Sequence, residues 1–540
     1  MADLDRLSLL IIEANQGMRG QLRSMLNNLG INAVQFAPSA GMAIGRLRER
    51  RYDVILCEYN LGEGQDGQHL LEDLRTKEII PPDTLFIMIT GERNHGRVVS
   101  AAELAPDDYI LKPLTPDTLR FRLVRAVEKR DTLRPVHRLI EKGETSAAIE
   151  ACAAGRAAQP RYRIDFMRQE AELQGALGQT ALAEALYREI LDVKPVPWAR
   201  LGLAKMLYAT KEYAEAEDLL SALVAENPRY VDAYDWLARV REESGRLDEA
   251  RETLAAAVAL SPHRIGRLRH FGNVLLAVGD HQSAERTLAE VVRKGKHSDF
   301  RDPEDHVRLV RAQLGQGRVG EAESTIRDLE RSMDGLPATA LCSALAKAHY
   351  FNQLGAPERA QSALQAGIQS AANVSGLSVD MKQELAKACL DNHLEAEGSM
   401  LVMDILRNAA DERTVETTRS LLRARGREDL SAELEQRVHG EVKASIAAGA
   451  EKVRNGDYDG AVQEMMGAVQ KMPGNPHVLF NAALALLRHI ENRGWNDRLA
   501  AQARGLIGRT RRLDPTNPRL DAITDFLHQL TKKYGARSQA

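Results

Sequence analysis

Four side chains that could act together on charge lie at the ends of short apolar segments in the first 113 residues. Glu13 ends LSLLIIE, Glu58 ends VILCE, Thr90 ends TLFIMIT, and Lys112 lies in DDYILKP. If the fold brings these groups together, Lys112 and Thr90 can donate charge-assisted hydrogen bonds to the carboxylate of Glu58. A lone Glu58 would instead be a surface carboxylate that caps the following loop.

The segment after Glu58 contains three glycines, Gly62, Gly64 and Gly67, in the spacing GxGxxG. Dinucleotide-binding turns use this spacing to let backbone N–H groups approach a pyrophosphate. Such a turn follows the first strand of its sheet and precedes an acidic residue by about 20 positions, whereas this one follows the third strand. We therefore interpret the three glycines as a flexible loop.

The elements that must position these side chains alternate along residues 1–130. Continuous apolar runs are separated by helix-like segments such as GMRGQLRSMLNNLG. Apolar runs without polar alternation are typical of parallel strands that helices cover on both faces, so the sequence predicts an α/β doubly wound sheet. Ligand sites of such sheets lie at the carboxyl ends of the strands, which is where the four side chains are expected.

The segments LLIIEANQGMRGQL and APDDYILKPLTPDTLRFRLVRAV resemble the receiver domain of bacterial two-component response regulators. The resemblance covers essentially all of residues 1–130 and implies a flavodoxin-like fold. Receivers carry an acidic pair after strand one, a phosphoacceptor aspartate after strand three, Thr or Ser after strand four, and Lys-Pro after strand five. This places Glu13, Ala14, Thr90 and Lys112 in the receiver pocket, with Glu58 as the phosphoacceptor equivalent.

Two of these positions depart from the family pattern. Ala14 lacks the second acid, and Glu58 extends its carboxylate one methylene farther than an aspartate. Because a divalent cation needs several oxygen ligands, magnesium binding should be weak, and no residual site at Glu13 and Glu58 is expected. Phosphoryl transfer should also be misaligned. The sequence predicts a pseudo-receiver in which Glu58 supplies a fixed negative charge.

The resemblance also implies a switch aromatic and a dimer face. Tyr109 falls at the aromatic position that couples a receiver's site to its surface. Receivers often pair through the fourth helix, fifth strand and fifth helix, where Asp107, Asp108 and Arg122 would lie. The alternatives are a half-buried strand aromatic at Tyr109 and ordinary surface charges at the other three positions.

The remaining chain repeats with a period near 34 residues. Pro160, Pro195, Pro228 and Pro262 are spaced 35, 33 and 34 residues apart. This period resembles the helical hairpin of the tetratricopeptide (TPR) repeat. Small and large apolar positions recur at matching offsets: Gly245, Ala250, Leu254 and Ala257 in one unit, and Gly279, Ala284, Leu288 and Val291 in the next. Each hairpin leaves a face that only its neighbour can bury, so we expect an all-α superhelical solenoid.

Four regions are expected along the chain. A receiver-like domain spans 1–130, a TPR array spans 131–375, degenerate helical repeats span 376–440, and a C-terminal TPR with capping helices spans 441–540. No stretch rich in Ser, Gly or Pro separates the first two regions, which predicts one semi-rigid unit. The basic runs RSLLRARGR and ARGLIGRTRRL are interpreted as amphipathic helices.

Composition argues against several classes of protein, namely nucleic-acid-binding, membrane-inserted and metal-binding proteins. The chain has 540 residues, 44% of them hydrophobic, with a formal net charge of −3. No global field favours nucleic acid or anionic membrane. No segment approaches the length of a membrane helix, which predicts a cytoplasmic protein without membrane insertion. The four cysteines are far apart and no metal-ligand spacing occurs, so neither a metal site nor a cofactor is expected.

These observations favour a non-catalytic signalling adaptor, because the sequence shows no set of catalytic residues beyond the altered phosphoacceptor pocket. Its pseudo-receiver and TPR groove would bind proteins without ordinary phosphoacceptance. The expected partners are a histidine kinase or response regulator, a peptide or helix in the groove, and a second copy of the chain. The alternatives are a phosphorylation-responsive regulator with a TPR output, and an assembly or chaperone-like scaffold.

Overall fold

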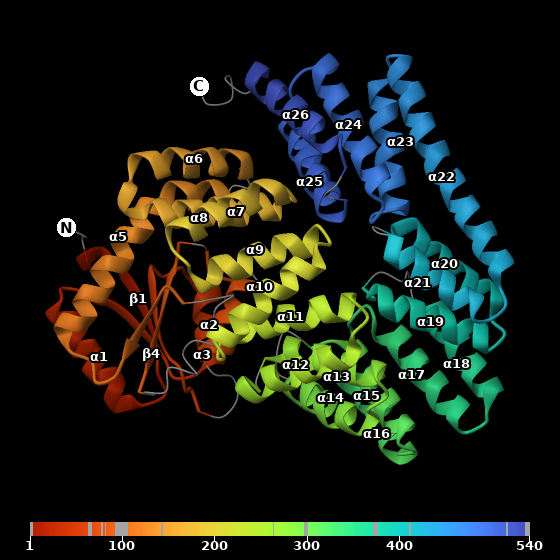
Figure 1. Cartoon of the computed structure of the whole chain (residues 1–540), viewed down its shortest axis with the longest axis horizontal. Helices are drawn as coiled ribbons and strands as arrows, with labels where there is room; N and C mark the ends of the chain where they lie inside the picture. The colour runs from red at the N-terminus through yellow and green to blue at the C-terminus, as the bar shows by residue number, and fades with distance from the viewer. Residues whose placement is uncertain are drawn as a thin grey trace. The chain divides into compact units, whose positions relative to one another are not determined.

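The structure is a computed structural model in which most of the chain is described (Figure 1). It divides into two compact units, which are treated separately below: Met1–Gly175 with Thr180–Val278, and Ala176–Gln179 with Gly279–Ala540. The described residues are 4–62, 67–76, 79–81, 83–91, 106–141, 144–262, 264–295, 301–370, 376–409, 412–514 and 517–534.

The first unit begins with a parallel five-stranded sheet in the order β2-β1-β3-β4-β5. Its strands are β1 (Ser8–Ile12), β2 (Ala33–Ala37), β3 (Val54–Glu58), β4 (Leu85–Thr90) and β5 (Asp108–Leu111). All residues of β3 and β4 are buried, as expected for strands covered on both faces. The strand β2, which the sequence did not locate, lies at the sheet edge, and among its residues Ala37 alone is buried.

Two apolar layers cover the sheet, because successive side chains of a strand point to opposite faces. Leu9 and Ile11 pack in the layer formed with α1 (Gln16–Asn28) and α5 (Pro116–Glu141). Leu10 and Ile12 pack in the opposite layer, with α2 (Ala40–Glu49) and α3 (Gly67–Thr76). Figure 1 shows α1 on one side of the sheet and α2 and α3 on the other. The predicted doubly wound α/β architecture is confirmed.

Helix α5 is shared between the sheet domain and the helical array. Its first half contributes Leu119 and Leu123 to the layer beneath the sheet, and its second half contributes Leu133 and Val136 to the first core of the array. The expected boundary at residue 130 therefore falls inside a continuous helix of 26 residues. Both parts of the first unit are built on this one helix.

Helical hairpins follow in the first unit, with turns at the predicted spacing. Gly245 adopts φ of 76° at one of these turns, and Lys211 adopts φ of 66° at the equivalent place. The helices are α6 (Thr145–Ala158), α7 (Arg163–Ala176), α8 (Thr180–Val193), α9 (Pro197–Ala209), α10 (Tyr213–Glu226), α11 (Val231–Glu243), α12 (Leu247–Leu260) and α13 (Ile265–Ala277).

The second unit continues the hairpins to the end of the described chain. One core joins α15 to α22, and another joins α22 to α26. The described residues of 376–440, where the sequence period blurs, form regular helices, and His393 (φ 60°) and Gly426 (φ 66°) lie at turns between them. The helices are α14 (His281–Gly295), α15 (Pro303–Gly315), α16 (Val319–Ser332), α17 (Thr339–Gln353), α18 (Pro357–Ser370), α19 (Val379–Asp391), α20 (Glu395–Asn408), α21 (Glu412–Arg423), α22 (Glu428–Arg454), α23 (Tyr458–Lys471), α24 (Pro476–Arg493), α25 (Asp497–Leu513) and α26 (Leu520–Tyr534).

The basic runs lie on helices and their ends, as interpreted from the sequence. Arg419 pairs with Glu435 at 3.0 Å, and Arg425 pairs with Asp391 at 2.7 Å. Arg511 of α25 is buried and donates to Thr524 Oγ1 at 2.7 Å. Across the described ranges, no helix has the length and apolar character needed to cross a bilayer.

Candidate functional site

The four chemically interesting side chains meet at the carboxyl edge of the sheet. Glu58 and Thr90 are the last residues of β3 and β4, Glu13 directly follows β1, and Lys112 directly follows β5. Because β1, β3, β4 and β5 are neighbours in that order, their ends lie side by side. Glu13, Glu58 and Thr90 are buried, and Lys112 is half-buried.

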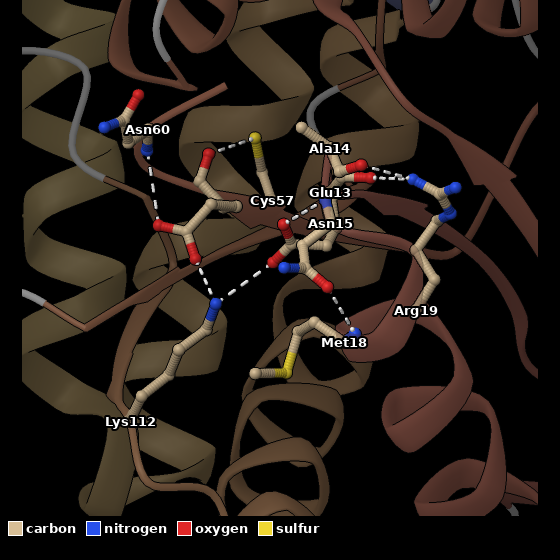
Figure 2. Close-up of polar contacts among 9 residues, drawn as sticks. Glu13, Ala14, Asn15, Met18, Arg19, Cys57, Asn60 and Lys112 are labelled. Carbon is tan, nitrogen blue, oxygen red and sulfur yellow. Dashed lines mark hydrogen bonds and ion pairs between the residues drawn. The ribbon is translucent and has the colours of Figure 1, made fainter. Parts of the chain in front are cut away.

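Lys112 joins the two carboxylates. Its Nζ contacts Glu58 Oε2 directly and lies 3.0 Å from Glu13 Oε2. Figure 2 shows the ammonium group between the two carboxylates. Burial alone would lower the pKa of Lys112, but its hydrogen bonds to Glu58 and Glu13 outweigh burial and raise that pKa above its usual value. The site therefore holds a charged lysine between two acids.

The other oxygen of each carboxylate is held by the backbone. Glu13 Oε1 accepts from the N–H of Asn15 at 2.9 Å, and Glu58 Oε1 accepts from the N–H of Asn60 at 3.2 Å. The N–H of Lys112 donates to the carbonyl oxygen of Thr90 at 2.8 Å, which ties the end of β5 to β4. Each acid is thus fixed between the lysine and the loop that follows its own strand.

An arginine that was not predicted from the sequence as part of the site lies beside Ala14. Arg19 Nη1 donates to the carbonyl oxygens of Glu13 and Ala14 at 2.7 and 2.8 Å. The sequence contained a signal for this contact, because Arg19 lies one helical turn after Asn15, the residue that caps α1. The guanidinium adds positive charge beside the place where receivers carry a second acid.

The donor set does not match what a receiver's magnesium ion requires. Magnesium demands near-octahedral oxygen ligands, and here two carboxylates are already bridged by an ammonium group. No cluster of three or more His, Cys, Asp or Glu side chains that could hold a metal ion occurs in the described segments. What remains is an internal ion cluster with one cation and two anions.

The three glycines after Glu58 have separate structural settings. Gly62 adopts φ of 91°, and Gly64 lies outside the described residues. Gly67 opens α3, and a Cβ there would lie 2.5 Å from the carbonyl oxygen of Glu58. The interpretation of Gly67 as a flexible loop position is therefore wrong, because it is needed for close packing against the end of β3.

Tyr109 lies on β5 and packs with Tyr59 against the sheet layer of α2 and α3. Burial raises the pKa of Tyr109, and the charges of Tyr59 and of Asp232 in α11 raise it further. The predicted switch aromatic therefore lies within electrostatic reach of a repeat helix.

The three charges of the predicted dimer face have partners within the domain. Asp108 pairs with Arg122 at 3.0 Å. Asp107 accepts from the N–H of Phe86 at 2.7 Å and lies 3.5 Å from Arg75. The fourth helix of the predicted face lies outside the described residues. These contacts give each charge a structural role in the isolated chain.

Family models match both parts of the chain. Residues 9–124 match the response regulator receiver domain, and residues 168–231 and 207–271 each match the tetratricopeptide repeat. Over 123 residues the chain is 28% identical to the chemotaxis protein CheY-3 of Vibrio cholerae serotype O1, a match that covers 23% of this chain and 93% of that protein. It is 24% identical to the chemotaxis protein CheY of Pseudomonas aeruginosa, over 23% of this chain and 98% of that protein.

Two solved structures are also similar to parts of the chain. A tetratricopeptide repeat protein from Parabacteroides merdae is 13% identical, with 48% of this chain and 98% of that chain covered and a TM-score of 0.34. The receiver domain of the Francisella response regulator 1452 is 21% identical, with 23% and 98% covered and a TM-score of 0.21. From the family matches, residues 9–124 are a response regulator receiver domain, and residues 168–271 are tetratricopeptide repeats.

Proposed function

We propose that this chain is a non-catalytic adaptor of two-component signalling whose receiver does not accept a phosphoryl group in the ordinary way. The observation that carries the proposal is the position of Lys112, whose ammonium group contacts both Glu58 and Glu13. In this arrangement the lysine ammonium group neutralises the two carboxylates that would otherwise interact with a divalent cation and a phosphoryl group.

Phosphoryl transfer depends on positioning and on neutralising the oxygens of the transferred group. A receiver achieves both with a metal ion, whereas this pocket has Ala14 in place of one acid and a glutamate in place of the acceptor aspartate. Glu58 instead forms an ion pair with Lys112. That pair supports a domain held in one signalling state, whose output is binding.

The array supplies the binding surfaces of the adaptor. TPR hairpins stack into a superhelix, and such solenoids offer extended concave surfaces to partners. A peptide or a helix of another protein is the proposed ligand of this groove, and a histidine kinase or response regulator is the proposed partner of the receiver. Pairing of two copies through the strand that carries Asp108 is a further proposal.

Phosphoryl uptake by the full chain tests the proposal. The chain is incubated with a small acyl phosphate and magnesium, and covalent uptake is followed by intact mass. We expect no uptake by the natural chain and uptake by the Glu58→Asp, Ala14→Asp double variant, because the second chain regains the acid pair and the shorter acceptor. Asp108→Asn serves as the matched control and should behave like the natural chain.

Uptake by the natural chain at a rate near that of the double variant would overturn the proposal. It would favour the alternative of a working regulator with a TPR output, for which Thr90 and Lys112 retain the family's residue types. Peptide mapping of the modified chain would then identify the carboxylate that carries the phosphoryl group.

A further inference from the structure

One helix, α5, connects the sheet domain to the first helical hairpin, and its two halves lie in different apolar cores. Its first half packs beneath the sheet as far as Val127, and its second half packs with α6 and α7 from Leu133 onward. Across the described stretch between Val127 and Leu133, Arg130 is the one residue that is buried. The link between the two cores therefore depends on what Arg130 contacts.

Arg130 joins α5 to the amino ends of two strands. Its side chain is 4% exposed, and its Nη1 donates to Asp53 Oδ1 at 3.3 Å. Asp53 directly precedes β3, and its Oδ2 accepts from the backbone N–H and from the hydroxyl of Ser8 at 2.9 and 2.8 Å. Ser8 is the first residue of β1. One carboxylate therefore ties β1, β3 and α5 together.

The same two strands carry the acids of the receiver pocket at their other ends. Glu13 directly follows β1, and Glu58 ends β3. The strands pair in parallel, with Leu9–Ile12 beside Val54–Cys57. The pocket and the Asp53–Arg130 contact therefore lie at opposite ends of one pair of strands.

The neighbours of Arg130 on α5 contact the array. Lys129 pairs with Asp165 of α7 at 2.5 Å, and Glu128 pairs with Arg161, which precedes α7, at 3.7 Å. All four side chains are at least 31% exposed, so water screens both pairs. Arg130 is the enclosed charge of the three on α5, and losing its partner would leave a buried cation uncompensated.

We propose that the Asp53–Arg130 contact locks the receiver to the first hairpin, so that β1, β3, α5, α6 and α7 open as one cooperative unit. Amides of such a unit exchange with solvent through a shared opening. A partner bound to the receiver then also stabilises the hairpin, and a partner bound to the hairpin stabilises the pocket strands, because either one disfavours that opening. The lock goes beyond the proposed function, since it holds whether or not Glu58 accepts a phosphoryl group.

Hydrogen–deuterium exchange on the full chain tests the lock through a mild change inside the receiver. Ile87→Val removes one methyl group from a buried side chain of β4, and such a change typically shifts an unfolding equilibrium by about fivefold. Ile87 packs in the layer beneath the sheet, whereas α6 packs in the first core of the array. With the lock in place, the slowest amides of β3 and of α6 should both exchange about fivefold faster.

Arg130→Met opens the lock, because it removes the guanidinium group and keeps an apolar stem. Asp53 retains its hydrogen bonds to Ser8, and its side chain is 39% exposed, so the variant should fold. In this background Ile87→Val should speed exchange in β3 and leave α6 unchanged. Arg134→Met is the matched control, since Arg134 lies one turn later on α5 and pairs with Asp131, the other acid that Arg130 contacts. There α6 should respond as in the natural chain.

Three results would overturn the lock. If Ile87→Val alone leaves α6 unchanged, the receiver and the hairpin open independently. If α6 still responds about fivefold in the Arg130→Met background, the continuous helix couples the two parts without the arginine. If Arg134→Met abolishes the response of α6 as well, the coupling does not belong to Arg130. None of these results changes the outcome expected for phosphoryl uptake, so the lock and the proposed function can fail separately.

Discussion

Two of the buried charge clusters in the described part of the chain have opposite designs. In the receiver one cation, Lys112, serves two acids, and the cluster opens at the edge of the sheet. In the array two arginines, Arg264 and Arg267, serve two aspartates. The first cluster has one carboxylate more than it has cations. The second is neutral, and its Asp232, Asp235 and Arg267 are buried while the side chain of Arg264 is 26% exposed.

The two clusters differ in the type of cation as well as in the number of cations. Arg267 presents a planar fork that engages both oxygens of Asp235, and its side chain is 1% exposed. Lys112 is a compact point charge on a flexible stem, and its side chain is 20% exposed. The array cluster therefore holds Arg267 and Asp235 in one planar, two-bond geometry, whereas the single ammonium group of Lys112 constrains its two carboxylates less.

The largest expected effect comes from breaking the enclosed cluster. Asp235→Asn leaves Arg267 buried without its carboxylate, and the loss of one partner of a buried ion pair should lower stability by about 3 kcal/mol. Denaturant unfolding of the full chain, followed by the fluorescence of Trp236 on the same helix, measures this change. Glu189→Gln is the control, since its pair with Arg163 is exposed on both sides and is expected to contribute less than about 1 kcal/mol.

Similar losses in the two variants would contradict the comparison. That outcome would mean that the Asp235–Arg267 pair tolerates water, in which case the neutral cluster would fix the repeat geometry no better than a surface ion pair.

A smaller effect is expected from the open cluster. Lys112→Met leaves Glu13 and Glu58 without their cation and should lower stability near neutral pH by about 2 kcal/mol, because water reaches part of the site and limits the cost. The pKa of Lys112 is raised in the folded chain, so its stabilisation is full below the usual lysine value of 10.5 and is lost as pH rises through the folded value.

The difference between the natural chain and Lys112→Met should therefore shrink at strongly alkaline pH. Unfolding curves of both chains at neutral and alkaline pH measure it. A difference that stays constant through the alkaline range would show that the ammonium charge is not what stabilises the site.

The sequence was most informative where local pattern determines structure. The strands that end at Glu58 and Thr90 were located because their residues are continuously apolar, and the pocket followed from parallel strands sharing one edge. The edge strand β2 lacks that pattern, since one residue of it is buried. The family matches bear out the predicted fold of the receiver and the repeats.

The burial of Asp232 could not be predicted from the local sequence pattern. Asp232 reads as an ordinary acid in the first turn of a helix, where the helix dipole alone favours a carboxylate. Its carboxylate is enclosed together with Arg264 and Arg267, which lie at the start of α13 and face it from the neighbouring repeat. Periodicity in the array predicts the helices but not which of their charged residues pair between neighbouring repeats.

The smallest expected change in stability comes from Lys211, where backbone strain and an exposed charge act in opposite directions. Lys211 is exposed and adopts φ of 66° at a hairpin turn where other repeats carry glycine. Lys211→Gly removes a positive charge but relieves a left-handed conformation that costs a residue with a side chain about 1 kcal/mol. If enclosed charges fix the array and exposed ones do not, this variant should be more stable than the natural chain by roughly that amount.

Gly245→Ala provides the opposite change at an equivalent turn. Gly245 has φ of 76°, and beyond its two chain neighbours no atom lies within 4 Å of the place where its Cβ would be, so any loss of stability comes from the backbone. We expect a loss of about 1 kcal/mol, measured by the same unfolding curves. A loss in Lys211→Gly as well would mean that the lysine's charge outweighs the strain of its turn, and the array would then depend on exposed charges that the comparison treats as minor.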